Sequence, residues 1–193
     1  MGAFSFTELA IPGARLVDCR VHRDQRGIFT RMLCADEFTA AGITRPFVQS
    51  NLSSNNTLGT VRGLHFLATP KREGKFVRCV VGAVFDVFVD IRKGSPTFGQ
   101  WYGVELSAEN ARAIYVPPGC AHGYQTLTEQ SVVSYFVQDS YDQSLDRTLS
   151  WADPAVGIDW PIADRAVLSE KDSAAPDLAG LEERDLLAFE RSC

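Results

Sequence analysis

Short segments in which apolar and polar residues alternate are the feature of this sequence that most constrains its fold. In residues 83–91 the apolar side chains recur at every second position, which is the period of a β-strand. Gly82 separates this segment from an apolar run at 76–80, and Gly94 and Pro96 supply turn residues after it. Further strands are expected at 101–106, 112–116, 123–128 and 131–138. Many short strands at this spacing predict an all-β protein, and an antiparallel jelly roll is the natural architecture.

Helices are expected to be a minor part of the fold. They are predicted at 35–41 and at 177–189, where an apolar stripe runs from Leu178 to Phe189. No linker, internal repeat or low-complexity segment divides the chain, so its 193 residues are expected to form a single domain, 1–193.

Composition narrows the classes of partner. The net charge is −5 and there is no block of lysines or arginines, which argues against a nucleic-acid groove or a membrane-binding patch. The chain shows neither a signal-like start nor a stretch of membrane-spanning length, and a cytoplasmic protein is expected. The five cysteines lack a Cys-x-x-Cys pair and indicate reduced, mostly buried thiols. A nucleophile formed by Cys120 and His122 is conceivable, but a small buried filler is the favoured interpretation of Cys120.

Two motifs carry most of the chemical information: the run Arg62-Gly63-Leu64-His65-Phe66 and the run Pro117-Pro118-Gly119-Cys120-Ala121-His122-Gly123. A metal-binding cupin barrel takes its ligands from a His-x-His pair, a Glu with six residues between it and a Gly, and a His that closes Pro-x-Gly-x-x-His. Here Leu67 stands in place of the second His, and Lys75 stands in place of the Glu. A cation beside at most two imidazoles repels a divalent metal. The pattern therefore predicts no metal and no cofactor, and leaves His65 as a base beside a cation.

Each candidate residue also has a plain structural interpretation. His65 could be a hydrogen-bonded core histidine, Lys75 a solvated charge, and His122 part of a turn. Tyr135 and Tyr141 could be ordinary strand aromatics, and six residues apart they would share a face of one uninterrupted strand. The run at 168–172 has the composition of a solvated charged segment. Asp24-Gln25-Arg26-Gly27 could be a simple hairpin turn, or it could supply a phosphate-binding arginine near the amides of Gln49 and Asn51.

Taken together, these residues resemble the family of dTDP-4-dehydrorhamnose 3,5-epimerases, which act on nucleotide-linked 4-keto-6-deoxy sugars. The resemblance extends from about residue 7 to 176. It is carried by Asp24-x-Arg26-Gly27-x-Phe29, Arg62-Gly63-Leu64-His65-Phe66, Lys75-x-Val77-Arg78-Cys79, Gly94-Ser95-Pro96-Thr97-Phe98-Gly99, Pro117-Pro118-Gly119-x-Ala121-His122-Gly123, Asp153-Pro154-x-x-Gly157-Ile158-Asp159-Trp160-Pro161 and Leu168-Ser169-Glu170-Lys171-Asp172. It implies a metal-free cupin-type jelly roll (double-stranded β-helix), and a homodimer in which N-terminal strands help to complete the partner's nucleotide site.

The resemblance also implies a role for each matching residue. His65 would be the proton acceptor with Asp172 as its carboxylate partner, Tyr135 the proton donor on the opposite face of the sugar, and Lys75 the cation that stabilises an enolate. Tyr141 would stack on the nucleotide base. The remaining residues expected to position the nucleotide-diphosphate sugar are Arg26, Phe29, Arg31, Gln49, Asn51, Arg62, His122 and Lys171.

Two positions depart from the family pattern. A Glu commonly stands where this chain has Arg31, and an acidic contact within a Pro-Glu pair is replaced by Gln143-Ser144. Both departures concern the nucleotide-binding part and leave the identity of the nucleotide open. The resemblance predicts inversion at both C3 and C5 of the sugar. Inversion at C3 alone, or a non-catalytic sugar-nucleotide-binding cupin, are the alternatives, although mere binding does not require an acid and a base on opposite faces.

Overall fold

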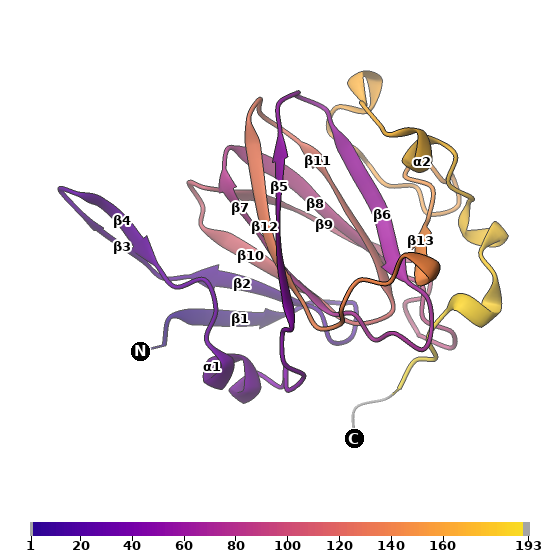
Figure 1. The fold of residues 1–193 in the computed structure, drawn as a ribbon, viewed down its shortest axis with the longest axis horizontal. Helices are drawn as coiled ribbons and strands as arrows, with labels where there is room; N and C mark the ends of the chain where they lie inside the picture. The colour runs from indigo at the N-terminus through magenta and orange to yellow at the C-terminus, as the bar shows by residue number, and fades with distance from the viewer. Residues whose placement is uncertain (1, 191–193) are drawn as a thin grey trace.

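Two antiparallel β-sheets packed face to face form the body of the protein, in a computed structural model that describes residues 2–190 (Figure 1). The six-stranded sheet has the order β1-β2-β10-β7-β12-β5, and the five-stranded sheet has the order β13-β6-β11-β8-β9. Most neighbours in each sheet are distant in sequence. Such crossing between two sheets is the jelly-roll topology that the strand pattern predicts.

The strands of the six-stranded sheet are, in chain order, β1 (Phe4–Glu8), β2 (Arg15–Cys19), β5 (Gln49–Asn55), β7 (Lys75–Val81), β10 (Arg112–Val116) and β12 (Ser131–Val137). Those of the five-stranded sheet are β6 (Val61–Leu67), β8 (Ala83–Asp90), β9 (Trp101–Ser107), β11 (Cys120–Thr126) and β13 (Asp146–Thr148). All six segments expected to be strands are therefore found. β11 begins three residues earlier than expected, so that His122 lies within a strand and not in the turn before it.

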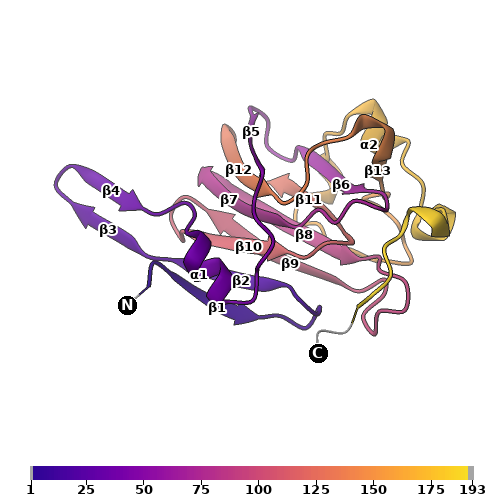
Figure 2. The same cartoon turned by 60° about the horizontal axis from the view of Figure 1, so that its bottom comes forward.

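A hairpin of β3 (Val21–Asp24) and β4 (Gly27–Thr30) makes no pairing with either sheet and projects away from the sandwich (Figures 1 and 2). Its apolar residues Ile28 and Phe29 are 53% and 69% exposed. The hairpin therefore exposes apolar side chains of β4 on a part of the chain that packs on neither sheet.

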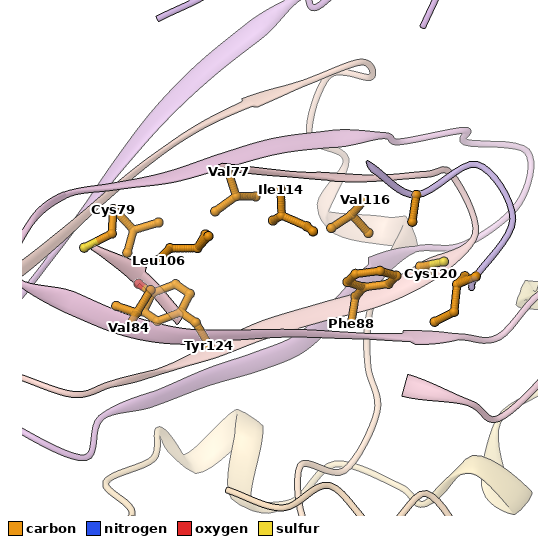
Figure 3. Packing of buried hydrophobic residues seen from close by; sticks show 12 residues of the cluster. Val77, Cys79, Val84, Phe88, Leu106, Ile114, Val116, Cys120 and Tyr124 are labelled. Carbon is orange, nitrogen blue, oxygen red and sulfur yellow. The ribbon is translucent and has the colours of Figure 1, made fainter. Parts of the chain in front are cut away.

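The core between the two sheets is formed by the inward-pointing side chains of both. Figure 3 shows Val77, Ile114 and Val116 of the six-stranded sheet facing Phe88 and Tyr124 of the five-stranded sheet. Phe88 is fully buried, which stabilises the fold by about 1.5–3 kcal/mol relative to an exposed phenylalanine. The odd-numbered apolar face of β8 instead points outward, and the C-terminal part of the chain covers it.

Helices are few, as expected, but one prediction is wrong. The helix α1 (Ala35–Ala40) forms and packs Phe38 against the outer face of the six-stranded sheet. The short α2 (Glu170–Ser173) and four 3-10 turns make up the rest: η1 (Gln143–Leu145), η2 (Ala163–Arg165), η3 (Leu178–Gly180) and η4 (Glu183–Asp185).

The segment 177–189 is not an α-helix: it consists of the two short 3-10 turns η3 and η4 joined by irregular chain, and it packs on the five-stranded sheet. Leu187 accepts a backbone hydrogen bond from Lys93, and Phe189 donates one back to Lys93. Its apolar residues pack against the sheet without forming an α-helix, so tertiary contacts override the helical period.

Two glycines allow β6 and β11 to come unusually close. A Cβ atom at Gly63 would lie 2.6 Å from the Cα atom of Gly123, and Gly63 has a φ of +133° that L side chains rarely adopt. The pairing of these strands changes register between His122 and Tyr124. Close backbone contact and a register shift therefore fix the position of His65, which lies directly opposite His122.

Candidate active site

A cavity of about 360 Å³ opens between the edges of the two sheets. Strands β5, β6, β7, β12 and β13 contribute to its wall, together with α2 and the segment after β12. It is lined by Gln49, Asn51, His65, Phe66, Leu67, Glu73, Lys75, Tyr135, Tyr141, Asp146 and Lys171. The structure thus brings together seven of the residues predicted from sequence, from six separate parts of the chain.

His65 and Asp172 form a hydrogen-bonded pair at this cavity. The Nε2 atom of His65 lies 2.7 Å from Oδ1 of Asp172, while Oδ2 of Asp172 accepts a longer bond of 3.4 Å from the backbone N–H of Gly63. The His65 side chain is 36% exposed and that of Asp172 only 5%. With Asp172 ionised, Nε2 of His65 carries the proton and Nδ1 is free to accept one.

The sequence 169–173 explains why Asp172 is available to His65. Ser169 caps the N-terminus of α2 by accepting a hydrogen bond from the Asp172 N–H, which turns the carboxylate toward β6. Burial raises the pKa of Asp172, but the hydrogen bond and charge of His65 and the N–H of Gly63 outweigh it, so that the net pKa lies below the ordinary value. The run that resembles a solvated charged segment therefore supplies a buried, ionised partner.

Lys75 points into the cavity, as predicted, and its side chain is 10% exposed. Its Nζ donates a hydrogen bond of 3.2 Å to the backbone carbonyl of His65 and lies 3.2 Å from Oε2 of Glu73. Sequence reasoning missed Glu73, because its neighbours 69–72 have the polar, proline-containing composition of an exposed loop. A spacing of two residues before a strand that starts at Lys75 was the available signal, since it places both side chains on one face.

Tyr135 lies on β12 of the six-stranded sheet, opposite Asn51 on β5. Burial raises the pKa of the Tyr135 phenol, and the negative charge of Glu73 raises it further while Arg62 opposes the change. The phenol is therefore protonated at neutral pH and can donate a proton. His65 is carried by the other sheet, so the two groups enter the cavity from facing walls.

A cluster of polar groups lines the part of the cavity near Tyr141. The phenol of Tyr141 donates to Oδ2 of Asp146 at 3.0 Å, and Nζ of Lys171 contacts the same oxygen at 2.5 Å. The backbone N–H of Tyr141 donates to Gln49, whose amide bonds to Asn51. Tyr141 is 57% exposed and lies beyond the end of β12, so it does not share an uninterrupted strand with Tyr135.

Gln143-Ser144 stands where the family pattern has an acidic contact, and a different carboxylate lines this part of the cavity. Asp146, the first residue of β13, places its carboxylate at the cavity beside Tyr141 and Lys171. Asp146 follows the 3-10 turn η1 and lies five residues after Tyr141 in the sequence. Sequence reasoning did not single it out.

His122 lies behind the cavity and not at its surface. It is 7% exposed, and its Nε2 lies 3.0 Å from both carboxylate oxygens of Asp86. Burial raises the pKa of Asp86, while His122 and the charge of Lys75 oppose the change. Cys120, on the same strand, is fully enclosed in the core, and burial raises the pKa of its thiol strongly, which fits the buried filler and not a nucleophile.

The remaining predicted residues do not line the cavity of their own chain, although Arg62 is near enough to Tyr135 to oppose the rise in its pKa. Arg26 binds Asp24 at the exposed tip of the hairpin, and Arg31 lies 3.4 Å from Glu37 of α1. Phe29 is exposed on the hairpin, and Arg62 points its Nε at Asn55, 2.7 Å away. Their roles as substrate contacts remain predictions.

Among residues 2–190 there is no group of three or more His, Cys, Asp or Glu side chains placed to hold a metal ion, and no helix there is long and apolar enough to cross a membrane. Cys193 lies outside the described residues. The other four cysteines, Cys19, Cys34, Cys79 and Cys120, are free.

Comparison with known proteins identifies the family of the chain. The family model described as dTDP-4-dehydrorhamnose 3,5-epimerase matches residues 8–180. The dTDP-4-dehydrorhamnose 3,5-epimerase of Sinorhizobium fredii is 46% identical over 176 residues, which cover 91% of this chain and 90% of that protein. The chain belongs to the dTDP-4-dehydrorhamnose 3,5-epimerase family.

Solved structures related to this epimerase family have the same fold. A dTDP-6-deoxy-D-glucose-3,5-epimerase of Legionella pneumophila, in complex with dTDP-4-keto-L-rhamnose, superposes with a TM-score of 0.93 at 36% identity and covers 97% of this chain and 100% of its own. A His-to-Asn, Tyr-to-Phe double mutant of a 3'-monoepimerase from Streptomyces bikiniensis, in complex with dTDP, superposes with a TM-score of 0.88 at 32% identity. It covers 94% of this chain and 92% of its own. The predicted cupin-type jelly roll is confirmed.

Proposed function

We propose that this protein is an epimerase that inverts C3 and C5 of a dTDP-linked 4-keto-6-deoxyhexose. The observation that carries the proposal is the placement of a base, His65, and an acid, Tyr135, on facing walls of one cavity, with the ammonium group of Lys75 between the same sheets. Family membership supplies the substrate class, since the matching proteins bear the name of this reaction.

The chemistry follows from the ketone. A carbonyl at C4 acidifies the hydrogens at C3 and C5, so a neutral imidazole with a free Nδ1 can remove either one. The electrons move onto the carbonyl oxygen, and the resulting enolate is stabilised by the ammonium group of Lys75. Tyr135 then delivers a proton to the opposite face of the same carbon, which inverts it. Asp172 keeps His65 in the required tautomer and stabilises the imidazolium that forms.

The related structures support these two assignments. The histidine and tyrosine replaced in the Streptomyces bikiniensis protein are separated by the same number of residues as His65 and Tyr135. That protein is described as a 3'-monoepimerase, so inversion at C3 alone is the second candidate for this chain. Both candidates use the same base and acid, and they differ in how many carbons pass through the enolate.

The test is turnover of dTDP-4-keto-6-deoxyglucose in heavy water, followed by NMR of the sugar. Each carbon that passes through an enolate exchanges its hydrogen for deuterium, so the number of exchanged positions separates the candidates. Deuterium at both C3 and C5 with an inverted product supports the double epimerase. Deuterium at C3 alone supports the second candidate, and no exchange at either carbon contradicts both.

We also propose that the active form is a homodimer in which the β3–β4 hairpin reaches the cavity of a second copy. The hairpin carries Arg26, Phe29 and Arg31, which do not line the cavity of their own chain. The strand β5, which contributes Gln49 and Asn51 to the cavity, is the edge of its sheet. A partner's hairpin beside that edge would satisfy unpaired backbone groups and bring positive charge to a diphosphate.

We further propose a cytoplasmic location for the protein, because the four described cysteines are free and free thiols are typical of a reducing compartment.

A further inference from the structure

Glu73 is the cavity residue for which the proposed mechanism has no use. Of the two carboxylates that line the cavity, Asp146 is engaged by Tyr141 and Lys171, whereas the ion-pair partner of Glu73 is Lys75 alone among the described residues. The Glu73 side chain is 12% exposed. Among the described residues Oε1 of Glu73 has no hydrogen-bond partner, and it is not one of the fully buried unpaired atoms, so this oxygen can accept a hydrogen bond from a ligand in the cavity.

The local chain geometry holds this carboxylate in place. Glu73 lies two residues before Lys75, the first residue of β7, and both side chains line the cavity. Gly74 between them passes so close to Gln138 and the Tyr115 hydroxyl that a Cβ atom there would collide with both. Because the backbone is confined at Gly74, the two charged groups enter the cavity as one unit.

The pair offers a donor and an acceptor side by side. Lys75 has three N–H donors, of which one is directed at the His65 carbonyl, while the ammonium group also forms an ion pair with Oε2 of Glu73. A further N–H is free for a ligand, as is the second carboxylate oxygen of Glu73. A ligand that matches this pair presents an acceptor next to a donor, and the ketone and the adjoining hydroxyl of a 4-keto sugar have this arrangement.

We propose that Glu73 is a substrate-recognition residue whose carboxylate accepts a hydrogen bond from the C3 hydroxyl while Lys75 donates to the C4 carbonyl oxygen. This assignment rests on the proposed function, which supplies the 4-keto sugar. Inversion at C3 moves the hydroxyl to the other face of the ring, so the contact distinguishes substrate from product. The site is therefore specific for an α-hydroxyketone and not for a ketone alone.

The experiment compares Glu73→Ala and Glu73→Gln with wild type on two substrates, dTDP-4-keto-6-deoxyglucose and its 3-deoxy analogue. The measured quantity is kcat/KM for deuterium exchange at C5, a carbon that both substrates possess. A hydrogen bond to a charged group contributes about 1.5–3 kcal/mol, so Glu73→Ala should lose roughly 10- to 100-fold on the hydroxylated substrate. On the 3-deoxy analogue the same variant should lose less than about threefold. Glu73→Gln, which keeps the shape of the side chain, should show a smaller difference of the same sign.

Other outcomes separate the possible errors. If Glu73 acted only by lowering the positive charge at Lys75, both variants would change exchange by the same factor with both substrates, and the assignment would be overturned. The control is Asp139→Asn, because Asp139 binds the N–H of Arg72 on the same loop without lining the cavity. An equal substrate-dependent loss in Asp139→Asn would attribute the effect to the loop and refute the role of Glu73. Absence of wild-type exchange with either substrate would refute the proposed function, and this assignment with it.

Discussion

Replacement of Asp172 by asparagine tests the dyad most sharply, because the structure predicts a mild loss. Both neighbours of the carboxylate are donors: Nε2 of His65 at 2.7 Å and the N–H of Gly63 at 3.4 Å. An asparagine has one oxygen, and the shorter contact is the more costly to lose, so we expect the oxygen to face His65 and the amide NH₂ to face Gly63. The tautomer of His65 is then preserved, and only the charge of its partner is removed.

The expected magnitude follows from this orientation. Exchange of a charge-assisted hydrogen bond for a neutral one costs about 1–2 kcal/mol, or roughly 5- to 30-fold in turnover. His65 is 36% exposed, which places the effect toward the lower end of this range because solvent screens the charge. If the asparagine turned its NH₂ toward His65, the wrong tautomer would be held and the loss would approach the roughly 10⁴-fold known for such reversals.

The assay is deuterium exchange into dTDP-4-keto-6-deoxyglucose by NMR, with dTDP affinity measured by calorimetry as the control for binding. His65→Asn should lower exchange by several orders of magnitude while dTDP affinity stays within about threefold, because the base acts on the sugar. A loss in Asp172→Asn as large as in His65→Asn would refute the proposed orientation. An unchanged rate in Asp172→Asn would show that the carboxylate does not support the base.

Three further predictions concern the acid, the fold and the hairpin. Tyr135→Phe should incorporate deuterium at C3 faster than it forms inverted product, because His65 can still remove the C3 proton and return one to the same face. An equal loss of exchange and of inversion would instead give Tyr135 a binding role. Asp90→Asn should lower stability by about 3–5 kcal/mol, roughly 6–20 °C in Tm, because it leaves the buried Arg92 charge without its partner. Burial raises the pKa of Asp90, but hydrogen bonds from Arg92, Ser95 and Thr97 hold it below the ordinary value. Its stabilisation is therefore present at neutral pH and lost as pH falls through that lowered pKa, so calorimetry should show a flatter acid dependence of Tm in the variant than in wild type. Phe29→Ser should shift the sedimentation profile toward monomer and lower activity most at low protein concentration, whereas Phe98→Ser, at another exposed phenylalanine, should change neither. A monomeric wild type would contradict the dimer.

The sheet strands could be predicted from sequence because their evidence is local. Alternation in 83–91 and turn residues at each end locate β8 without knowledge of its neighbours. The segment 177–189 could not be predicted in this way. Leu178 and Leu186 have a spacing that fits an α-helix, but they can also pack on a sheet when the segment is not an α-helix. Only the partner surface decides between these states.

Predictability of the site followed the same distinction. Lys75 could be placed inward because apolar neighbours follow it, whereas Glu73 follows Lys71 and Arg72 and has the local composition of a solvated loop. The link between Asp172 and His65 spans 107 positions, and no local pattern in the run 168–172 records it. It entered the sequence interpretation through family resemblance, and the physical contact is visible only in the fold.

The assignment of base and acid to different sheets has a consequence for stereochemistry. His65 and Tyr135 are mounted on separate layers, so the thickness of the core between the layers sets the gap that a sugar ring has to bridge. Phe88 and Ile114 are spacers in this sense, although neither lines the cavity. Core substitutions that bring the layers together or apart would alter the balance between proton return on one face and delivery on the other. Under the proposed assignment of base and acid, interior packing thus contributes to the stereochemical outcome together with the groups that move the proton.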